Sequence, residues 1–188
     1  MRFETLRFET DGHVATVVLN RGSTGNLIDQ GTASELGDVC DQLERNEDIR
    51  VAIVAGDGDC FCRGTFPKAM EDMRGTLRFL RVAERIARVR KPVVAAITGD
   101  AIDQGLELAL ACDLRVASSQ ARLGLTQAKH GLVPWDGGTQ RLPRLVGRGR
   151  AMEMLLTSRL VDATEALEMG LVSQVVEPDA VLPRVREV

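Results

Sequence analysis

The sequence predicts an α/β fold in which helices and strands alternate in layers. Two short, continuous apolar runs, residues 51–55 and 93–98, have the composition of strands that are buried on both faces. Segments with a helical spacing of apolar residues lie between and after these runs, and glycine or proline marks their ends. The chain has 188 residues, of which 44% are hydrophobic and 27% are charged, and this suits one globular domain over residues 1–188.

The chain is expected to open with an antiparallel hairpin. Residues 6–10 and 14–19 alternate in polarity, and Asp11-Gly12 between them is a dipeptide that two-residue hairpin turns favour. The sequence Arg-Phe-Glu-Thr occurs twice, at residues 2–5 and 7–10, and is expected to extend an edge strand. The first two strands are therefore expected at the border of a sheet.

The next segments predict a helix, a strand and a second helix. Residues 29–45 place apolar side chains three and four residues apart, which is the pattern of an amphipathic helix. The strand at residues 51–55 follows and is stopped by Gly56-Asp-Gly58. We expect the second helix over residues 71–90, where Lys91-Pro92 ends it.

The second expected helix carries a stripe of arginines at steps of four and three residues, which places them along one face. The stripe consists of Arg74, Arg78, Arg81, Arg85 and Arg88. A solvated face is the ordinary explanation for such a stripe. The functional alternatives are a contact with the phosphates of a ligand, with an acidic partner or with RNA.

The second half of the chain continues the alternation. Residues 93–98 predict a strand, and residues 104–112 predict a helix that is buried on most sides. The remaining expected elements are strands at residues 114–117, 122–125 and 172–176 and helices at residues 139–145, 150–156 and 164–169.

The composition excludes several classes of function. A formal net charge of −3 and only 3% aromatic residues, with no Tyr, argue against nucleic-acid binding. No apolar run approaches the roughly 20 residues of a membrane span, and the N-terminus lacks an apolar secretory core, so we expect no membrane partner and a cytoplasmic protein. The cysteines lack the spacing of metal ligands, so we expect buried free thiols and no metal.

Two loops that leave the buried strands carry the candidate site. Residues 61–66 follow the first strand and residues 99–105 follow the second, and each loop contains glycine and can present unpaired main-chain N–H groups. The second loop enters a helix that begins near Gln104, where the first turn has free donors and a partial positive charge. Two such donors aimed at one point form an oxyanion hole.

Glu107 is the expected proton-transfer carboxylate. It follows Gln104 by three residues, about one helical turn, and so projects near the donors. It also lies between two leucines in an apolar helix, where a buried carboxylate is costly unless it is used or paired.

These segments together resemble the crotonase family, also called the enoyl-CoA hydratase/isomerase family, over residues 1 to about 178. The resemblance rests on Asn26-Leu-Ile28 and on residues 61–66, 99–113, 131–143 and 163–176. It implies a crotonase-like spiral superhelix of ββα units, with most of the C-terminal helical segment missing because the chain ends at Val188. It also implies a homotrimeric or hexameric enzyme that acts on an acyl-CoA thioester, with coenzyme A entering as part of the substrate and no separate cofactor.

The resemblance implies roles for individual residues. The backbone N–H groups of Arg63 and Gln104 are the expected oxyanion donors to the thioester carbonyl, and Glu107 is the expected acid/base. Contacts with the substrate or its coenzyme A part are expected from Asn26, Leu27, Ile28, Gly64, Thr65, Phe66, Asp103, Gly105 and Trp135.

One departure from the family pattern affects the chemistry. Gln127 stands where the hydratases have a second glutamate, and an amide can orient a water but can neither give nor take its proton. One acid/base group is typically worth about 10²- to 10⁴-fold in rate, so a simple hydratase with this site is expected to be slow. Asp136 and Asp103 are the candidates to replace the missing carboxylate, although an Asp before Gly137 is also an ordinary turn residue.

Two functions from different classes stay open at this point. The first is an enzyme of the enoyl-CoA hydratase/isomerase type, in which a single carboxylate suits double-bond isomerisation at least as well as water addition. The second is a non-catalytic protein that binds CoA thioesters or serves in assembly, having lost the second carboxylate.

Overall fold

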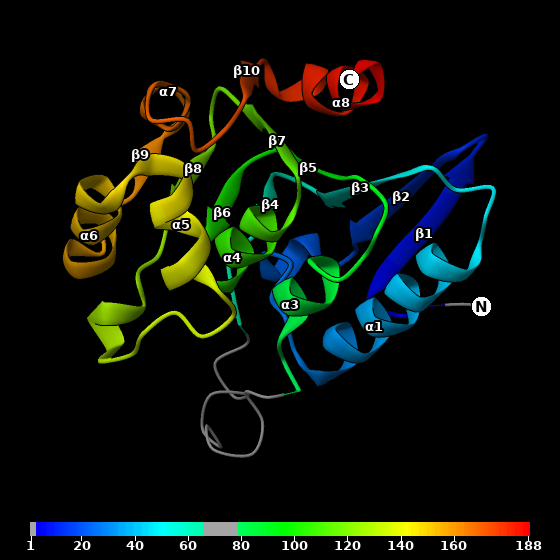
Figure 1. Cartoon of the computed structure of the whole chain (residues 1–188), viewed down its shortest axis with the longest axis horizontal. Helices are drawn as coiled ribbons and strands as arrows, with labels where there is room; N and C mark the ends of the chain where they lie inside the picture. The colour runs from blue at the N-terminus through cyan, green and yellow to red at the C-terminus, as the bar shows by residue number, and fades with distance from the viewer. Residues whose placement is uncertain (1–2, 66–78) are drawn as a thin grey trace.

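The computed structural model describes residues 3–65 and 79–188, and this part of the chain contains two sheets with helices around them (Figure 1). The six-stranded sheet has the order β1-β2-β3-β5-β7-β10, with β1 (Leu6–Asp11), β2 (Val14–Leu19), β3 (Val51–Gly56), β5 (Val93–Ile97), β7 (Leu114–Ser118) and β10 (Gln174–Val176). The four-stranded sheet has the order β4-β6-β8-β9, with β4 (Cys60–Cys62), β6 (Asp100–Ile102), β8 (Arg122–Gly124) and β9 (Val161–Asp162).

The expected opening hairpin is confirmed. Strands β1 and β2 pair antiparallel, with Leu6 opposite Leu19 and Asp11 opposite Val14, and β1 lies at the edge of its sheet. Every later pairing in the six-stranded sheet is parallel, from β2 with β3 to β7 with β10. Parallel strands have both faces covered, which is why residues 51–55 and 93–98 read as continuous apolar runs.

Most of the expected helices are present among the described residues, whereas the 3₁₀ turns were not expected. The α-helices are α1 (Gln30–Arg45), α3 (Val82–Ile86), α4 (Gln104–Ala111), α5 (Gly138–Val146), α6 (Arg148–Thr157), α7 (Ala163–Glu168) and α8 (Val181–Glu187). The 3₁₀ turns are η1 (Gly22–Thr24), η3 (Gln127–His130) and η4 (Pro178–Ala180). Within residues 3–65 and 79–188, no helix has the length and apolar character that crossing a membrane requires.

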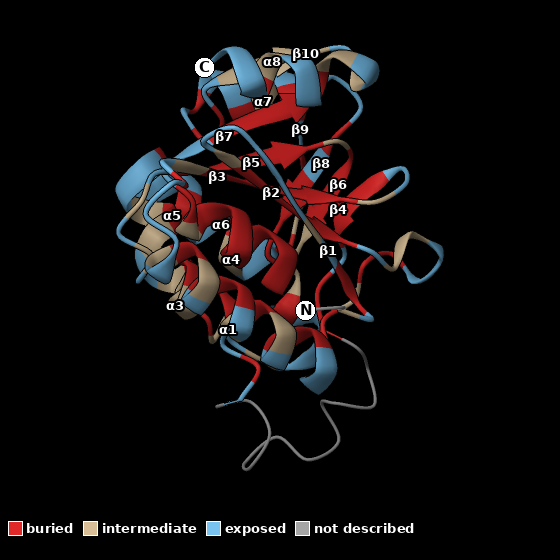
Figure 2. Ribbon diagram, turned by 90° about the vertical axis from the view of Figure 1, so that its right-hand side faces the viewer, coloured by how far each residue is buried: buried red, intermediate tan, exposed pale blue. Residues whose placement is uncertain are grey.

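Helices cover both faces of the six-stranded sheet. On one face, Leu36 of α1 and Leu106 of α4 belong to the main core together with Val54 of β3. On the other face, Val181 and Val185 of α8 form a smaller core against the strands. Figure 2 shows α4 almost wholly buried between the sheet and the outer helices, and this burial fixes the position of the residues that α4 carries.

The prediction of one helix over residues 71–90 is wrong in the part that the structure describes. Only Val82–Ile86 is helical there, residues 79–81 and 87–90 are not, and residues 71–78 lie outside the described residues. Helix α3 begins where it does because the carboxylate of Asp136 accepts the N–H groups of Ala83 and Glu84, at 2.8 and 3.1 Å. A cap that lies 53 residues along the chain from Ala83 leaves no local trace in the sequence.

In the part of the chain that the structure describes, the arginine stripe does not lie on one helix, because Arg81 and Arg88 are outside α3. Arg81 and Arg88 both pair with Glu84, at 3.3 and 2.5 Å, so these two guanidinium groups meet an acid on their own segment. Arg74 and Arg78 lie outside the described residues.

The short strands of the four-stranded sheet were not expected from the sequence, apart from the one at residues 122–125. Strands β4, β6 and β9 have two or three residues each, which is too short for a periodic pattern to be recognised. They matter because β4 and β6 pair in parallel and carry the two candidate loops at neighbouring ends.

Candidate functional site

The two candidate loops meet directly against each other at the start of α4. A Cβ atom added to Gly105 would lie 2.0 Å from the carbonyl oxygen of Cys62, so α4 touches the backbone of β4. A Cβ atom added to Gly64 would lie 3.7 Å from the main-chain nitrogen of Gln104. Gly64 also has a φ of 102°, a backbone conformation that favours glycine. The expected convergence of the two loops is thus present.

The structure corrects one of the two expected donors. The N–H of Arg63 donates to the carbonyl oxygen of Gly25 at 2.9 Å, so it is already used inside the protein. Its guanidinium group turns away to pair with the buried carboxylate of Asp100 at 3.3 Å. The sequence could not reveal this, because it depends on how the first loop lies against the turn that precedes Asn26.

Thr65, two residues further along, is the candidate to replace Arg63 as a donor. Ile28 donates its N–H to the carbonyl oxygen of Gly64 at 2.8 Å and forms a parallel bridge with Thr65. In a parallel bridge of this kind the N–H of the opposite residue points away from the neighbouring strand. Among the described residues no acceptor takes the Thr65 N–H.

The second expected donor is the N–H of Gln104, and no acceptor among residues 3–65 and 79–188 takes it. Gln104 is the first residue of α4, and the first main-chain N–H groups of a helix have no acceptor within the helix. The N-cap residue of α4 is Asp103, and its carbonyl oxygen accepts the N–H of Glu107 at 3.0 Å. The candidate donor pair is therefore Thr65 and Gln104.

Glu107 lies fully buried on the same turn of α4. Its Oε1 accepts the main-chain N–H groups of Asp136 and Gly138, each at 2.8 Å, while its Oε2 lies 3.5 Å from the amide nitrogen of Gln127. A Cβ atom added to Gly138 would lie 3.0 Å from Glu107 Oε1, so the close approach of this turn depends on glycine. Main-chain donors thus hold Oε1 in place, and Oε2 is the oxygen that can exchange a proton.

The surroundings of Glu107 favour its neutral form. Burial raises its pKa from the ordinary value of 4.5 to about 7, and the neighbouring carboxylates of Asp136 and Asp103 add to this effect. The two main-chain N–H donors favour the charged form and act in the opposite direction. A carboxyl group with a pKa near neutrality can serve both as base and as acid under ordinary conditions.

This raised pKa predicts a pH-dependent stability. Between pH 4.5 and about 7 the folded chain holds a proton that the unfolded chain releases, so stability falls as pH rises through this window. Above pH 7 the free energy of unfolding is lower than below pH 4.5 by on the order of 3 kcal/mol. We expect Glu107→Gln to be more stable than the wild type at pH 8 and to lose this advantage near pH 4.5. Urea unfolding at both pH values measures it, and an equal difference at both would contradict the account.

Gln127 also faces the interior of the site. Its side chain is 2% exposed, and its Oε1 has no hydrogen-bond partner within the described part of the chain. The amide orientation with the nitrogen toward Glu107 avoids two facing oxygens when Glu107 is ionised. A buried carbonyl oxygen without a partner is costly, so Gln127 presents an acceptor for a group that a ligand or a water brings.

Asp136 lies next to Glu107 but turns its carboxylate elsewhere. In addition to capping α3, Asp136 Oδ2 accepts the side-chain amide of Gln104 at 3.0 Å. Burial raises the pKa of Asp136, and its hydrogen bonds oppose this. Its contact with Glu107 runs through its main-chain N–H, so the geometry gives it a positioning role.

Asp103 holds the second loop in place. Its carboxylate accepts the N–H of Thr126 at 2.5 Å and the hydroxyl of Thr126 at 2.9 Å, so it is tied to the residue just before Gln127. Its φ of 53° is rare for a residue with a side chain and costs about 1–3 kcal/mol.

The expected coenzyme A contacts at residues 26–28 are only partly accessible. Asn26 is buried, and its side chain donates to the carbonyl oxygens of Asp57 and Cys60 and accepts the N–H of Arg21. Ile28 lies in the core, whereas Leu27 is half-buried. Phe66 lies outside the described residues.

Trp135 borders the site on its outer side. It is half-buried, and its indole N–H has no partner among residues 3–65 and 79–188. It lines a cavity of about 550 Å³ together with Asp136 and Arg141. No group of three His, Cys, Asp or Glu side chains in the described ranges could hold a metal ion.

Comparisons with known proteins show which family the chain resembles. Residues 9–188 match the enoyl-CoA hydratase/isomerase family. The chain is 43% identical over 180 residues to (E)-benzylidenesuccinyl-CoA hydratase of Thauera aromatica, covering 92% of this chain and 70% of that protein. It is 34% identical to crotonyl-CoA hydratase of Syntrophomonas wolfei, covering 100% of this chain and 75% of the relative.

The fold agrees equally well with a solved structure. The crystal structure of an enoyl-CoA hydratase from Bacillus anthracis superposes with a TM-score of 0.93 at 36% identity, covering 98% of this chain and 74% of that one. The expected fold class, α/β of the crotonase type, is therefore confirmed.

Proposed function

Because the chain belongs to the enoyl-CoA hydratase/isomerase family, we propose that it binds an enoyl-CoA thioester and adds water to its double bond. The observation that carries this proposal is the environment of Glu107. One of its oxygens is held by two main-chain N–H groups, the other has no main-chain donor in the described part of the chain, and burial raises its pKa to about 7. The residue is thereby prepared to take a proton and to return one.

The thioester oxygen would lie between the N–H groups of Thr65 and Gln104. Addition at the β-carbon moves negative charge onto this oxygen and forms an enolate, which two fixed donors stabilise. Each donor of this kind is typically worth about 10²- to 10³-fold in rate. The unpaired state of both amides among the described residues supports this assignment.

Water would be held between Gln127 and Glu107. One O–H donates to Gln127 Oε1, the acceptor that lacks a partner within the described chain, and the other proton passes to Glu107 Oε2 as the oxygen adds to the β-carbon. Protonated Glu107 then returns a proton to the α-carbon, which neutralises the enolate. One carboxylate can perform both steps in turn, whereas the Gln127 amide only orients the water.

Double-bond isomerisation is a second candidate, and the single carboxylate favours it. Glu107 would remove a proton from the α-carbon of a 3-enoyl-CoA and return it to the γ-carbon. The same two N–H donors would stabilise the dienolate. In this reaction Gln127 needs no water.

An absorbance assay separates these functions. Hydration of crotonyl-CoA removes the absorbance of the conjugated thioester, whereas isomerisation of a 3-enoyl-CoA creates it. We expect loss of absorbance with crotonyl-CoA and formation of 3-hydroxybutyryl-CoA. Gain of absorbance from a 3-enoyl-CoA alone would favour the isomerase. Thermal stabilisation by CoA thioesters without turnover of either substrate would favour the non-catalytic alternative.

Gln127→Glu provides a test of the water position. We expect this substitution to raise the rate of hydration by about tenfold or more, because a second proton-transfer group is typically worth about 10²- to 10⁴-fold. The same change at an exposed site, Gln30→Glu, is expected to leave the rate unchanged. A Gln127→Glu enzyme no faster than the wild type would show that Gln127 does not face the reacting water.

The proposal also includes an assembled enzyme. A single domain over residues 1–188 would associate as a homotrimer or hexamer, with Leu27 on the coenzyme A side of the site. Light scattering of the purified chain measures its mass in solution, and a monomer at working concentration would contradict this part of the proposal.

A further inference from the structure

The geometry points to a positioning role for the Gln104 side chain: we propose that it locks together the two residues whose amides face the thioester oxygen and connects them to the turn that holds Glu107. This inference rests on the proposed function. It concerns the side chain of Gln104, whereas the proposed function uses only its main-chain N–H.

The first part of the lock is a side-chain bond between the two donor residues. The hydroxyl of Thr65 donates to Gln104 Oε1 at 2.6 Å, and both side chains are buried, at 8% and 0% exposure. A buried bond of this length restricts the rotation of both residues relative to each other. Because the main-chain N–H groups belong to the same two residues, the bond restricts their relative position as well.

The second part of the lock is the amide nitrogen of Gln104. Nε2 donates to Asp136 Oδ2 at 3.0 Å and to the carbonyl oxygen of Leu80. The two N–H bonds of the amide are thus both used, and its oxygen accepts from Thr65. The reversed orientation of the amide would place its oxygen against two acceptors, so only one orientation satisfies all three partners.

The connection to Glu107 runs through Asp136. The carboxylate of Asp136 is held by Gln104 and by the first N–H groups of α3, and its own N–H holds Glu107 Oε1 at 2.8 Å. A continuous set of hydrogen bonds therefore links Thr65, Gln104, Asp136 and Glu107. Three segments that are distant in the sequence, those of Thr65, of α4 and of Asp136, are thus held together through one amide.

Such a lock has a direct consequence for catalysis. Oxyanion donors stabilise charge only when they are fixed before the reaction, since moving them during the reaction costs the energy that they supply. A displacement of about 1 Å in a catalytic group can cost about 10²-fold in rate. The Gln104 side chain is then expected to affect kcat much more than substrate binding.

Thr65→Val tests the lock with the smallest change. It removes the hydroxyl and keeps the main-chain N–H, and we expect kcat to fall about tenfold or more with KM within about threefold of the wild type. Thr65→Ser restores a hydroxyl and is expected to recover most of this loss. Thr98→Val removes a buried hydroxyl that has no partner in the described chain, and we expect no change in kcat. Equal kcat for Thr65→Val and wild type would overturn the proposal.

A double-variant cycle tests whether the effect acts through Gln104. Gln104→Met keeps the length of the side chain and removes its hydrogen bonds, so adding Thr65→Val to it should lower kcat little further. Independent, multiplying losses would overturn the proposal. If Gln104→Met does not fold, the comparison of Thr65→Val with Thr65→Ser still decides the matter.

Binding of acetoacetyl-CoA separates this inference from the proposed function. Its enolate absorbs in the ultraviolet, and an intact donor pair is expected to raise the enolate fraction of the bound ligand in the wild type but less in Thr65→Val. Wild-type protein without turnover on any enoyl-CoA, but with this difference, would remove the proposed reaction and support the lock. If the wild type turns over an enoyl-CoA, but Thr65→Val has the same kcat and the same enolate fraction, the proposed reaction is supported and the lock is overturned. Wild-type protein that neither turns over nor binds these thioesters would overturn both.

Discussion

Glu107→Gln is expected to lower kcat by about 10²- to 10⁴-fold, the usual worth of an acid/base group, and to leave the affinity for acyl-CoA within a few fold. Glutamine keeps an oxygen that can accept the N–H groups of Asp136 and Gly138, so the turn is retained. It cannot exchange a proton, so the chemical step is lost while binding remains. Steady-state kinetics on crotonyl-CoA and calorimetric titration with a saturated acyl-CoA measure the two parts.

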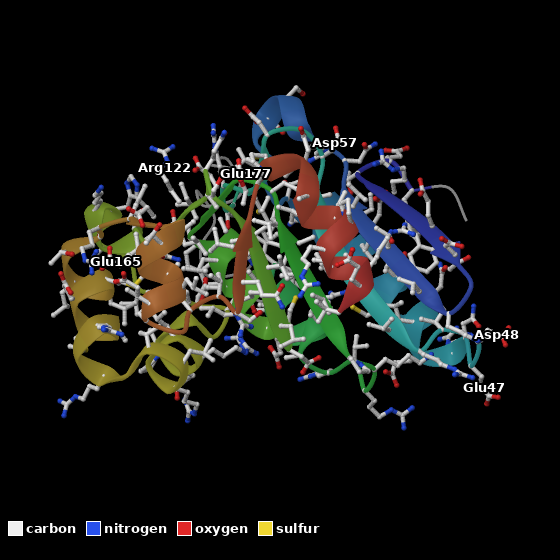
Figure 3. The ribbon with its side chains drawn as sticks, turned by 90° about the horizontal axis from the view of Figure 1, so that it is seen from above. Glu47, Asp48, Asp57, Arg122, Glu165 and Glu177 are labelled. Carbon is white, nitrogen blue, oxygen red and sulfur yellow. The ribbon has the colours of Figure 1, made fainter. Side chains whose placement is uncertain are left out.

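A control is available at the exposed residue Glu47. Glu47 is exposed in the loop after α1, at the periphery of the view in Figure 3, and Glu47→Gln makes the same chemical change there. We expect Glu47→Gln to have wild-type kinetics. Unchanged kcat in Glu107→Gln would remove Glu107 from the mechanism and leave the two N–H donors without a proton-transfer partner.

Gly105→Ala is expected to have the second large effect, on both activity and stability. The added Cβ would lie 2.0 Å from the carbonyl oxygen of Cys62, which is a main-chain atom and cannot rotate away. Helix α4 would have to move away from β4, which would separate the N–H groups of Thr65 and Gln104. We expect a loss of about 10²-fold in kcat and of about 1–3 kcal/mol or more in stability.

The control for Gly105→Ala is the same change at an open position. Gly149 lies in α6, is exposed, and has no atom within 4 Å of an added Cβ. Gly149→Ala is expected to keep full activity and to raise stability by about 0.5–1 kcal/mol, because alanine favours the helix. A Gly105→Ala enzyme that matched Gly149→Ala in activity would contradict the close contact between α4 and β4.

Local patterns explain why much of the fold could be predicted. The hairpin of β1 and β2 follows from Asp11-Gly12 and polarity alternation, and α1 follows from apolar spacing and from Asp29, which caps the helix by accepting the Thr32 N–H. These features act within a few residues of where they stand. Elements without such signals, such as β6 and β9, were missed.

The parts of the site that could not be predicted depend on contacts between distant segments. Whether Arg63 or Thr65 offers a free N–H is decided by Gly25 and Ile28, which lie in a different loop. Gln104 was expected from the sequence to contribute its main-chain N–H, and the three partners of its side chain appear only in the folded chain. Gly138 lies within residues 131–143, a segment on which the family resemblance rests. The hydrogen bond that its N–H donates to Glu107 explains what this residue does in the site.

A crystal structure with bound acetoacetyl-CoA would test the account most directly. The proposed mechanism predicts the thioester oxygen within about 2.7–3.1 Å of the main-chain nitrogens of both Thr65 and Gln104, with Glu107 Oε2 facing the α-carbon. A thioester oxygen that contacts only one of these nitrogens, or lies on the far side of Glu107, would contradict it.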